Sequence, residues 1–117
     1  MKEGNVILDK SYLFALRVVR LYVLLRDKKE FHLSAQIVRS GTSVGANIEE
    51  AIGGSSRKDF RAKLDIAYKE ARETRFWLRL LRDGSLLESS LANSLINDCE
   101  ELIRIFTSIL NSVKRNS

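Results

Sequence analysis

Long segments of this chain place apolar residues at alternating spacings of three and four. The clearest repeat is at the C-terminal end, where it runs for about five turns through Leu95, Cys99, Leu102, Phe106, Ile109 and Val113. Because an α-helix has about 3.6 residues per turn, this spacing aligns them along one helix face. The chain also contains no proline, the commonest helix breaker. The pattern predicts an all-α protein.

The repeats predict four helices, at residues 9–27, 34–52, 57–83 and 88–113. Before the third, Ser56 with Asp59 has the form of an N-terminal capping box, and Gly84 is expected to end that helix. Short connections between long helices favour antiparallel neighbours. We therefore expect a single domain, residues 1–117, that folds as an antiparallel up-down-up-down four-helix bundle.

The predicted helix 34–52 is crowded with small residues. Its interior glycines, Gly41 and Gly45, each cost about 1 kcal/mol relative to alanine. A compensating gain is close approach of another helix, because a side chain at either position would hold the two backbones apart. We therefore expect a neighbouring backbone to pass close to both glycines.

The predicted helix 9–27 is apolar on nearly every face, and Leu13 and Leu24 interrupt its narrow polar strip. A four-helix domain of this size cannot bury one helix on all sides. Phe76 and Trp77 also lie off the core seam of the helix 57–83. Apolar surface left in this way is typical of subunit contacts. The pattern therefore predicts a homo-oligomer.

Basic charge is concentrated on two segments of this chain, whose net charge is +5. Residues 57–83 hold nine Lys/Arg and five Asp/Glu, net +4, and residues 9–29 hold six and two, also net +4. In the helix 57–83, basic residues recur on the face opposite the core seam: Lys58, Arg61, Arg72, Arg75, Arg79 and Arg82. Arginine forks suit phosphate groups, so these six are the predicted nucleic-acid-binding residues. The alternative is a solvated face whose arginines pair with acidic neighbours. Lys114 lies off this stripe and is expected to contribute little.

No arrangement of residues typical of catalysis or metal binding is present. A carboxylate-bridged di-metal site would need a Glu-x-x-His on each of two helices, and the one histidine, His32, falls in a predicted loop. Cys99 lies on a core seam, where a thiol is inert. Asn47, Glu50 and Glu73 are expected to link helices through hydrogen bonds rather than to act in catalysis. We therefore expect no enzyme activity, no cofactor and no metal.

The sequence also bears on location. The first ten residues lack the apolar run of a secretory signal, and Arg17 and Arg20 interrupt the best candidate for a membrane span. The single cysteine suits a reducing compartment. We expect a cytoplasmic protein that does not enter a membrane.

The stretch from the second to the third predicted helix carries a family likeness. Its residues are Gln36, Arg39, Ser43-Val44, Asn47-Ile48, Glu50-Ala51, Ser56 to Phe60, Lys63-Leu64, Ile66-Ala67, Lys69 to Ala71, Glu73-Thr74 and Trp77-Leu78. In these residues the chain resembles the four-helix bundle protein family, also called 23S rRNA-intervening-sequence proteins.

The resemblance implies a left-handed up-and-down bundle. The family has no established enzymatic activity, and some of its members form ring-shaped homopentamers. It also implies kinship with the accessory variability determinant of diversity-generating retroelements, a basic pentamer that binds nucleic acid and a reverse transcriptase. The expected partners are therefore other copies of the chain, as a pentamer, and RNA or DNA. The alternative is an adaptor without nucleic-acid affinity that docks a protein such as a reverse transcriptase.

Overall fold

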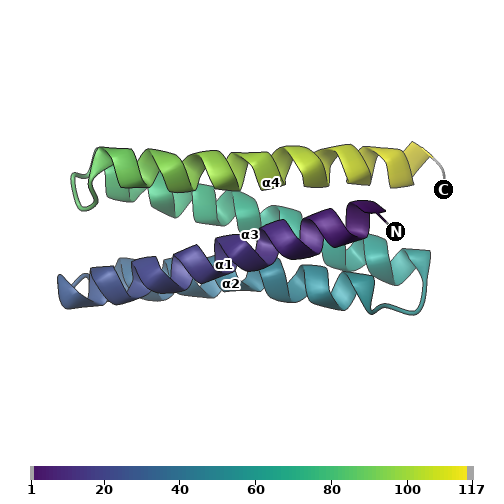
Figure 1. The fold of residues 1–117 in the computed structure, drawn as a ribbon, viewed down its shortest axis with the longest axis horizontal. Coiled ribbons are helices and arrows are strands. Elements are labelled where there is room, and N and C mark those ends of the chain that lie inside the picture. The colour runs from purple at the N-terminus through teal and green to yellow at the C-terminus, as the bar shows by residue number, and fades with distance from the viewer. Residues whose placement is uncertain (1, 116–117) are drawn as a thin grey trace.

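The chain forms four antiparallel α-helices in a computed structural model that describes the backbone of residues 2–115 and the side chains of residues 4–114. The helices are α1 (Lys2–Asp27), α2 (Phe31–Ile52), α3 (Arg57–Asp83) and α4 (Ser89–Arg115). Each packs on the next in sequence, and α4 closes the bundle with a smaller contact to α1 (Figure 1). Within residues 2–115, no Cα atom of α1 lies within 8 Å of a Cα atom of α3, so the two helices lie diagonally across a molecule measuring 46 × 20 × 20 Å. The predicted all-α, antiparallel bundle is confirmed.

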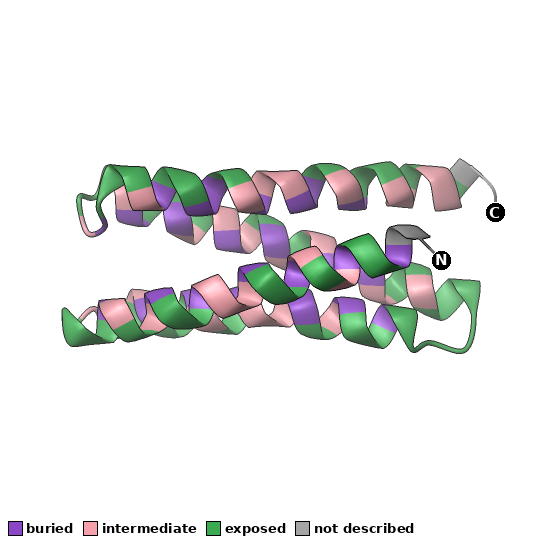
Figure 2. Cartoon of the chain, viewed as in Figure 1, coloured by how far each residue is buried: buried purple, intermediate pink, exposed green. Residues whose placement is uncertain are grey.

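Each helix turns one seam inward, as the alternation of buried and exposed turns in Figure 2 shows. In α2, α3 and α4 the seams expected from the sequence form this core, and α1 adds Phe14 to it. The largest fully buried side chains include Phe14, Phe106, Ile37, Ile48, Leu64, Leu78 and Leu95. In α1 the buried seam leaves the opposite side open to solvent. Tyr12 and Leu13 are 63% and 58% exposed there. The expectation that a single chain leaves part of this apolar helix uncovered is confirmed.

The helix bounds differ from the prediction mainly at two starts. α1 begins at Lys2 rather than near residue 9, because the buried residues Gly4 and Ile7 extend its core seam by another turn. α2 begins at Phe31 rather than at residue 34 because Lys29, with a φ of 65°, ends the preceding turn abruptly. The start of α1 therefore depends on the packing of a few buried atoms. The start of α2 depends on Lys29, which adopts a left-handed conformation although it is not a glycine. The bounds of α3 and α4 lie within about two residues of those predicted.

The cap of α3 is half of the predicted capping box. Ser56 Oγ accepts a hydrogen bond from the Asp59 backbone N–H at 3.0 Å, but the Asp59 carboxylate accepts from Ser55 Oγ at 2.9 Å instead of reaching back. At the other end the helix closes on Gly84, whose φ of −83° is ordinary, and Ser85 takes the left-handed conformation with φ 61°. The termination is therefore predicted correctly, although the strained residue is the one after the glycine.

Gly41 and Gly45 both face α1, as expected, but different atoms approach them. A Cβ at Gly45 would lie 3.3 Å from the backbone oxygen of Ser11. A Cβ at Gly41 would lie 2.7 Å from Val18 Cγ1, so here the close neighbour is a side chain and not a backbone. The two glycines thus allow about two turns of α1 to pack closely on α2.

Candidate nucleic-acid interface

The N-terminal half of the predicted stripe borders a groove between α3 and α4. Lys58 and Arg61 of α3 line it together with Lys114 of α4, and the groove has a volume of about 460 Å³. Its remaining lining residues are Ala62, Asp65, Leu110 and Asn111. The expectation that Lys114 lies apart from the stripe is wrong: the antiparallel packing of α4 on α3 places residue 114 beside residues 58 and 61.

Further along α3, Arg72 and Arg79 are both exposed. Arg72 Nη1 donates to the hydroxyl of Tyr68 at 3.0 Å, and its guanidinium lies 5.7 Å from the centre of that ring. This contact holds the guanidinium beside the Tyr68 ring, while the side chain of Arg72 stays exposed. Arg79 forms no hydrogen bond or ion pair with any side chain among residues 4–114.

Arg75 and Arg82 instead turn sideways onto α4. Arg75 Nη1 lies 3.8 Å from Glu100 Oε2. Arg82 donates to Asn93 Oδ1 at 2.9 Å and to Asp83 Oδ1 at 2.8 Å, and the bond to Asp83 raises the pKa of Arg82. A repeat of three and four advances less than 3.6 residues per turn on average, so the stripe drifts around the helix until it meets α4. The six predicted residues therefore occupy one side of the molecule but not one outward face.

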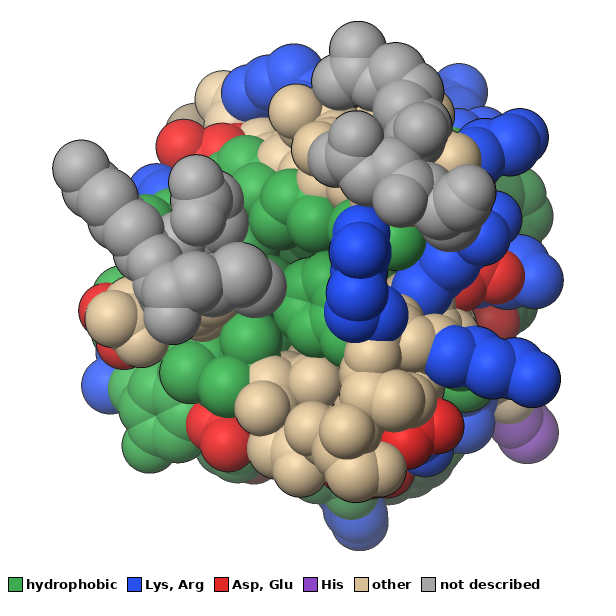
Figure 3. Space-filling view, turned by 90° about the vertical axis from the view of Figure 1, so that its right-hand side faces the viewer, with side chains coloured by type: hydrophobic (Ala, Val, Ile, Leu, Met, Phe, Trp, Pro, Cys, Tyr) green, Lys and Arg blue, Asp and Glu red, His purple; other side chains and the backbone are tan. Residues whose placement is uncertain are grey.

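α4 adds a cation that sequence reasoning on α3 alone does not identify. Arg104 is exposed, and it precedes the groove residue Asn111 by two helical turns, which places both on the same side of α4. Lys and Arg side chains accordingly gather along one side in the end-on view of Figure 3, whereas hydrophobic side chains are exposed at the lower left. We call this set the α3–α4 basic surface: Lys58, Arg61, Arg72, Arg75, Arg79, Arg82, Arg104 and Lys114. The α4 members, Arg104 and Lys114, could be added from the sequence only by combining their positions on α4 with its antiparallel packing on α3.

The second polar cluster joins α2 to α3. Arg39 donates to Glu70 at 2.9 Å and also to Glu73, which in turn accepts from the Trp77 indole N–H at 3.0 Å. The hydrogen bond from Trp77 and the guanidinium of Arg39 lower the pKa of Glu73, and the bond to Glu73 raises the pKa of Arg39. Every charged group here has a partner of opposite sign or a donor. The expected linking role of Glu73 is confirmed.

The other two members of that predicted cluster differ from each other. Glu50 links α2 to α3 through an ion pair with Lys63 at 2.8 Å. Asn47 donates instead to Ser43 O at 2.8 Å and Ser43 Oγ at 3.0 Å, one turn back in its own helix. Only Glu50 therefore joins Glu73 in holding the two helices together.

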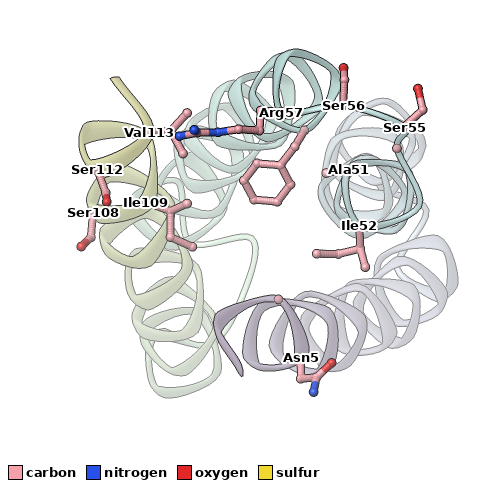
Figure 4. A pocket seen from close by; sticks show the side chains of 13 residues that line it. Asn5, Ala51, Ile52, Ser55, Ser56, Arg57, Ser108, Ile109, Ser112 and Val113 are labelled. Atoms are coloured by element: carbon pink, nitrogen blue, oxygen red, sulfur yellow. The ribbon is translucent and has the colours of Figure 1, made fainter. Parts of the chain in front are cut away.

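A hollow of about 760 Å³ opens at the end of the bundle where α1 and α3 begin. Figure 4 shows Ile52 and Ile109 pointing toward its centre, Arg57 reaching across toward Val113, and Asn5 pointing away. Its lining includes no carboxylate, imidazole or thiol among residues 4–114. Four serines and one asparagine line the hollow beside its apolar residues and Arg57, but none of its lining residues is a base that could activate a serine.

The remaining reactive side chains lie apart from one another. Cys99 is buried on the α4 seam, donates to Ala71 O at 3.1 Å, and has a pKa raised by burial to about 12. His32 is exposed in the first turn of α2, not in a loop as predicted, because that helix begins earlier. Among the described residues, no three His, Cys, Asp or Glu side chains come together as metal ligands would. No helix in that part of the chain has the length and apolar character needed to span a bilayer.

The fold and its surface define a basic four-helix bundle, and comparison with known proteins places it in a family. Residues 3–108 match the family of the 23S rRNA-intervening sequence protein, to which the chain therefore belongs. A crystal structure of a protein of unknown function from the S23 ribosomal protein family of Bacteroides thetaiotaomicron is similar, with 47% sequence identity and a TM-score of 0.88. The match covers 93% of this chain and 98% of that one. A search of curated proteins gives no match.

Proposed function

We propose that this protein is a cytoplasmic, non-enzymatic homo-oligomer, with a pentamer as the family resemblance implies, that binds RNA or DNA through the α3–α4 basic surface. The observation that carries the proposal is the groove where Lys58, Arg61 and Lys114 converge from two helices. A groove lined by cations from both walls suits a phosphate backbone better than a single exposed stripe does, because each phosphate meets donors from more than one direction.

Repetition around an oligomer supplies the strength of binding. Each chain offers a few phosphate contacts, and partial neutralisation by Asp65 and Glu100 keeps the affinity of one copy low. Several copies on one polyanion convert later contacts into intramolecular ones, with effective concentrations in the millimolar range for short spacings. No base-reading arrangement is visible among the described residues, so binding without sequence preference is expected.

Charge reversal tests the proposal at single residues. Arg61→Glu and Arg104→Glu should each weaken binding to a fluorescently labelled RNA or DNA by about tenfold at low salt, because each removes a phosphate contact and adds repulsion. Lys29→Glu makes the same charge change in the exposed α1–α2 turn and should have little effect. If all three variants bind like the wild type, the α3–α4 basic surface is not the binding site.

The alternative is an adaptor that docks a protein such as a reverse transcriptase. The observation in its favour is the exposed ring of Phe76, 51% accessible and packed edge-on against Trp77 with centroids 5.2 Å apart. Exposed aromatic pairs are typical anchors of protein interfaces. Wild-type protein that binds no nucleic acid at low salt would favour this alternative.

A further inference from the structure

The two helices that lie diagonally across the bundle carry most of the exposed large apolar side chains. On α1 the exposed apolar residues include Tyr12, Leu13 and Val23, and on α3 they include Phe76 and Leu80. Since α1 and α3 are diagonal in the bundle, these faces point in opposite directions. A chain with two different apolar faces on opposite sides is suited to head-to-tail association, in which one face of each copy covers the other face of the next.

The two faces lie at the same height along the bundle, and α4 shows this because both helices contact it. Neighbouring α4 residues are contacted from both helices at two heights: Lys10–Glu101 (3.1 Å) with Arg75–Glu100 (3.8 Å), and Arg17–Ser94 (3.1 Å) with Arg82–Asn93 (2.9 Å). Arg17 also reaches Asp98, one turn further along α4. The stretch of α1 that holds Leu13 is therefore level, to within about two residues, with the stretch of α3 that holds Phe76. The two helices also run in the same direction.

Charged residues on the two faces are complementary at this alignment. Asp9 and Arg20 on α1 are separated by the same number of residues as Arg72 and Asp83 on α3. The first residue of each pair and the second residue of each pair carry opposite charges. Leu13 follows Asp9 by as many residues as Phe76 follows Arg72. Two parallel helices with this register pair Asp9 with Arg72, and Arg20 with Asp83, around an apolar centre. In the single chain neither Asp9 nor Arg20 forms an ion pair with another side chain among residues 4–114.

The charges also fall on matching sides of the two faces. Arg20 follows Arg17 by one turn, and Arg17 donates to Asp98 of α4 at 2.5 Å. Arg72 precedes by one turn Arg75, which contacts α4 as well. Arg20 and Arg72 therefore lie toward α4 on the two outer faces, which favours an arrangement with the α4 helices of successive copies on the same side.

We propose that copies of this chain associate side by side, with the outer face of α1 in one copy packed in parallel on the outer face of α3 in the next. The proposal rests on the proposed homo-oligomer and names the surfaces that build it. Because the faces are level to within about two residues, successive copies can associate side by side with little shift along the bundle axis. Arg72 then lies in the interface, and phosphate binding falls to the other members of the α3–α4 basic surface.

Two variants that each spoil one face test the head-to-tail arrangement by sedimentation velocity. Leu13→Glu removes the α1 face and Phe76→Glu removes the α3 face, and both residues are more than half exposed, so helix content by circular dichroism should not change. Each variant alone should sediment as a 13.3 kDa chain. Their equimolar mixture should form a dimer and nothing larger, because only one intact face of each kind remains. If Leu13→Glu dissociates while Phe76→Glu keeps the wild-type mass, a symmetric α1–α1 contact replaces the proposed one.

A charge exchange tests the register without changing the apolar centre. Asp9→Arg and Arg72→Asp should each raise the dissociation constant of the oligomer by about tenfold or more, and the double variant should recover most of the loss. Asp9→Arg combined with Arg79→Asp is the matched control and should show no recovery. Equal behaviour of the two double variants would overturn the register. RNA binding by Arg61→Glu is measured separately, so failure of the interface and failure of the proposed function are distinguishable.

Discussion

Gly41 is the position where one added carbon has the most predictable effect. A Cβ built there lies 2.7 and 2.8 Å from the two methyl carbons of Val18 and 3.1 Å from its Cβ, and Val18 is fully buried. A β-branched residue in a helix has one strongly preferred rotamer, so Val18 cannot turn aside. Leucine at position 41 gains up to about 1 kcal/mol of helix propensity but overpacks the contact. We expect Gly41→Leu to lower the free energy of unfolding by about 1–3 kcal/mol.

A double-mutant cycle isolates the contact. Val18→Ala alone should cost about 2 kcal/mol, from two methyl groups and the space they leave. In the variant that also carries Gly41→Ala, the new methyl group occupies that space, so the pair should be less destabilised than the sum by about 1–2 kcal/mol. Gly45→Ala is the matched control, since its neighbour is Ser11 O at 3.3 Å and it should add to Val18→Ala without coupling. Urea denaturation at one protein concentration measures all of these. The packing described would be refuted if Gly41→Leu left the free energy of unfolding unchanged, or if the effects of Val18→Ala and Gly41→Ala were additive.

Three further predictions concern titration and helix docking. The Cys99 thiol, with a pKa of about 12, should react with iodoacetamide at pH 8 much more slowly in the native protein than in urea. Because folding raises the pKa of this thiol, the neutral thiol contributes fully to stability at any pH below the ordinary pKa of cysteine. The contribution falls as the pH rises toward 12. A Cys99→Ala variant should therefore lack this alkaline decline in the urea midpoint. Trp77 and Arg39 hold the pKa of Glu73 below its ordinary value, so Glu73 stabilises the fold at neutral pH and this is lost as pH falls through the lowered pKa. In a plot of the urea midpoint against pH, Glu73→Gln should show a smaller decline at acidic pH than the wild type. The same decline in both proteins would contradict the proposed contribution of the Arg39–Glu73–Trp77 contacts. Arg17→Met removes an ion pair whose arginine is 31% exposed, and by urea denaturation it should cost less than about 1 kcal/mol.

The core of the bundle was predictable because it depends on spacing within each helix. Residues such as Leu64 and Leu78 are buried wherever a helix with that repeat meets another apolar face, so the seams needed no knowledge of the neighbour. The start of α1 was not predictable in the same way. Among the side chains described from residue 4 onward, Gly4 and Ile7 are the buried residues near its start, and their burial depends on how the end of the bundle closes.

The candidate site was predictable only in part, for a related reason. The basic composition of α3 is visible in the sequence, but the direction of each arginine depends on what α4 presents. Arg75 turns toward Glu100, whereas Arg79 forms no ion pair with α4 among residues 4–114 and stays exposed. Lys114 joins the groove only because α4 runs antiparallel to α3. A sequence pattern along one helix cannot identify residues of the next helix that the antiparallel packing places beside it.

The salt dependence of nucleic-acid binding tests the central claim most directly. Phosphate contacts release counterions, so the logarithm of the binding constant should fall linearly with the logarithm of salt concentration, with a slope of about −0.7 for each contact to a single strand and −0.9 to a duplex. We expect a steep slope for the wild type, and a slope shallower by about one contact in Arg61→Glu. No binding even at low salt, or binding that does not change with salt, would contradict a phosphate-binding role for the α3–α4 basic surface.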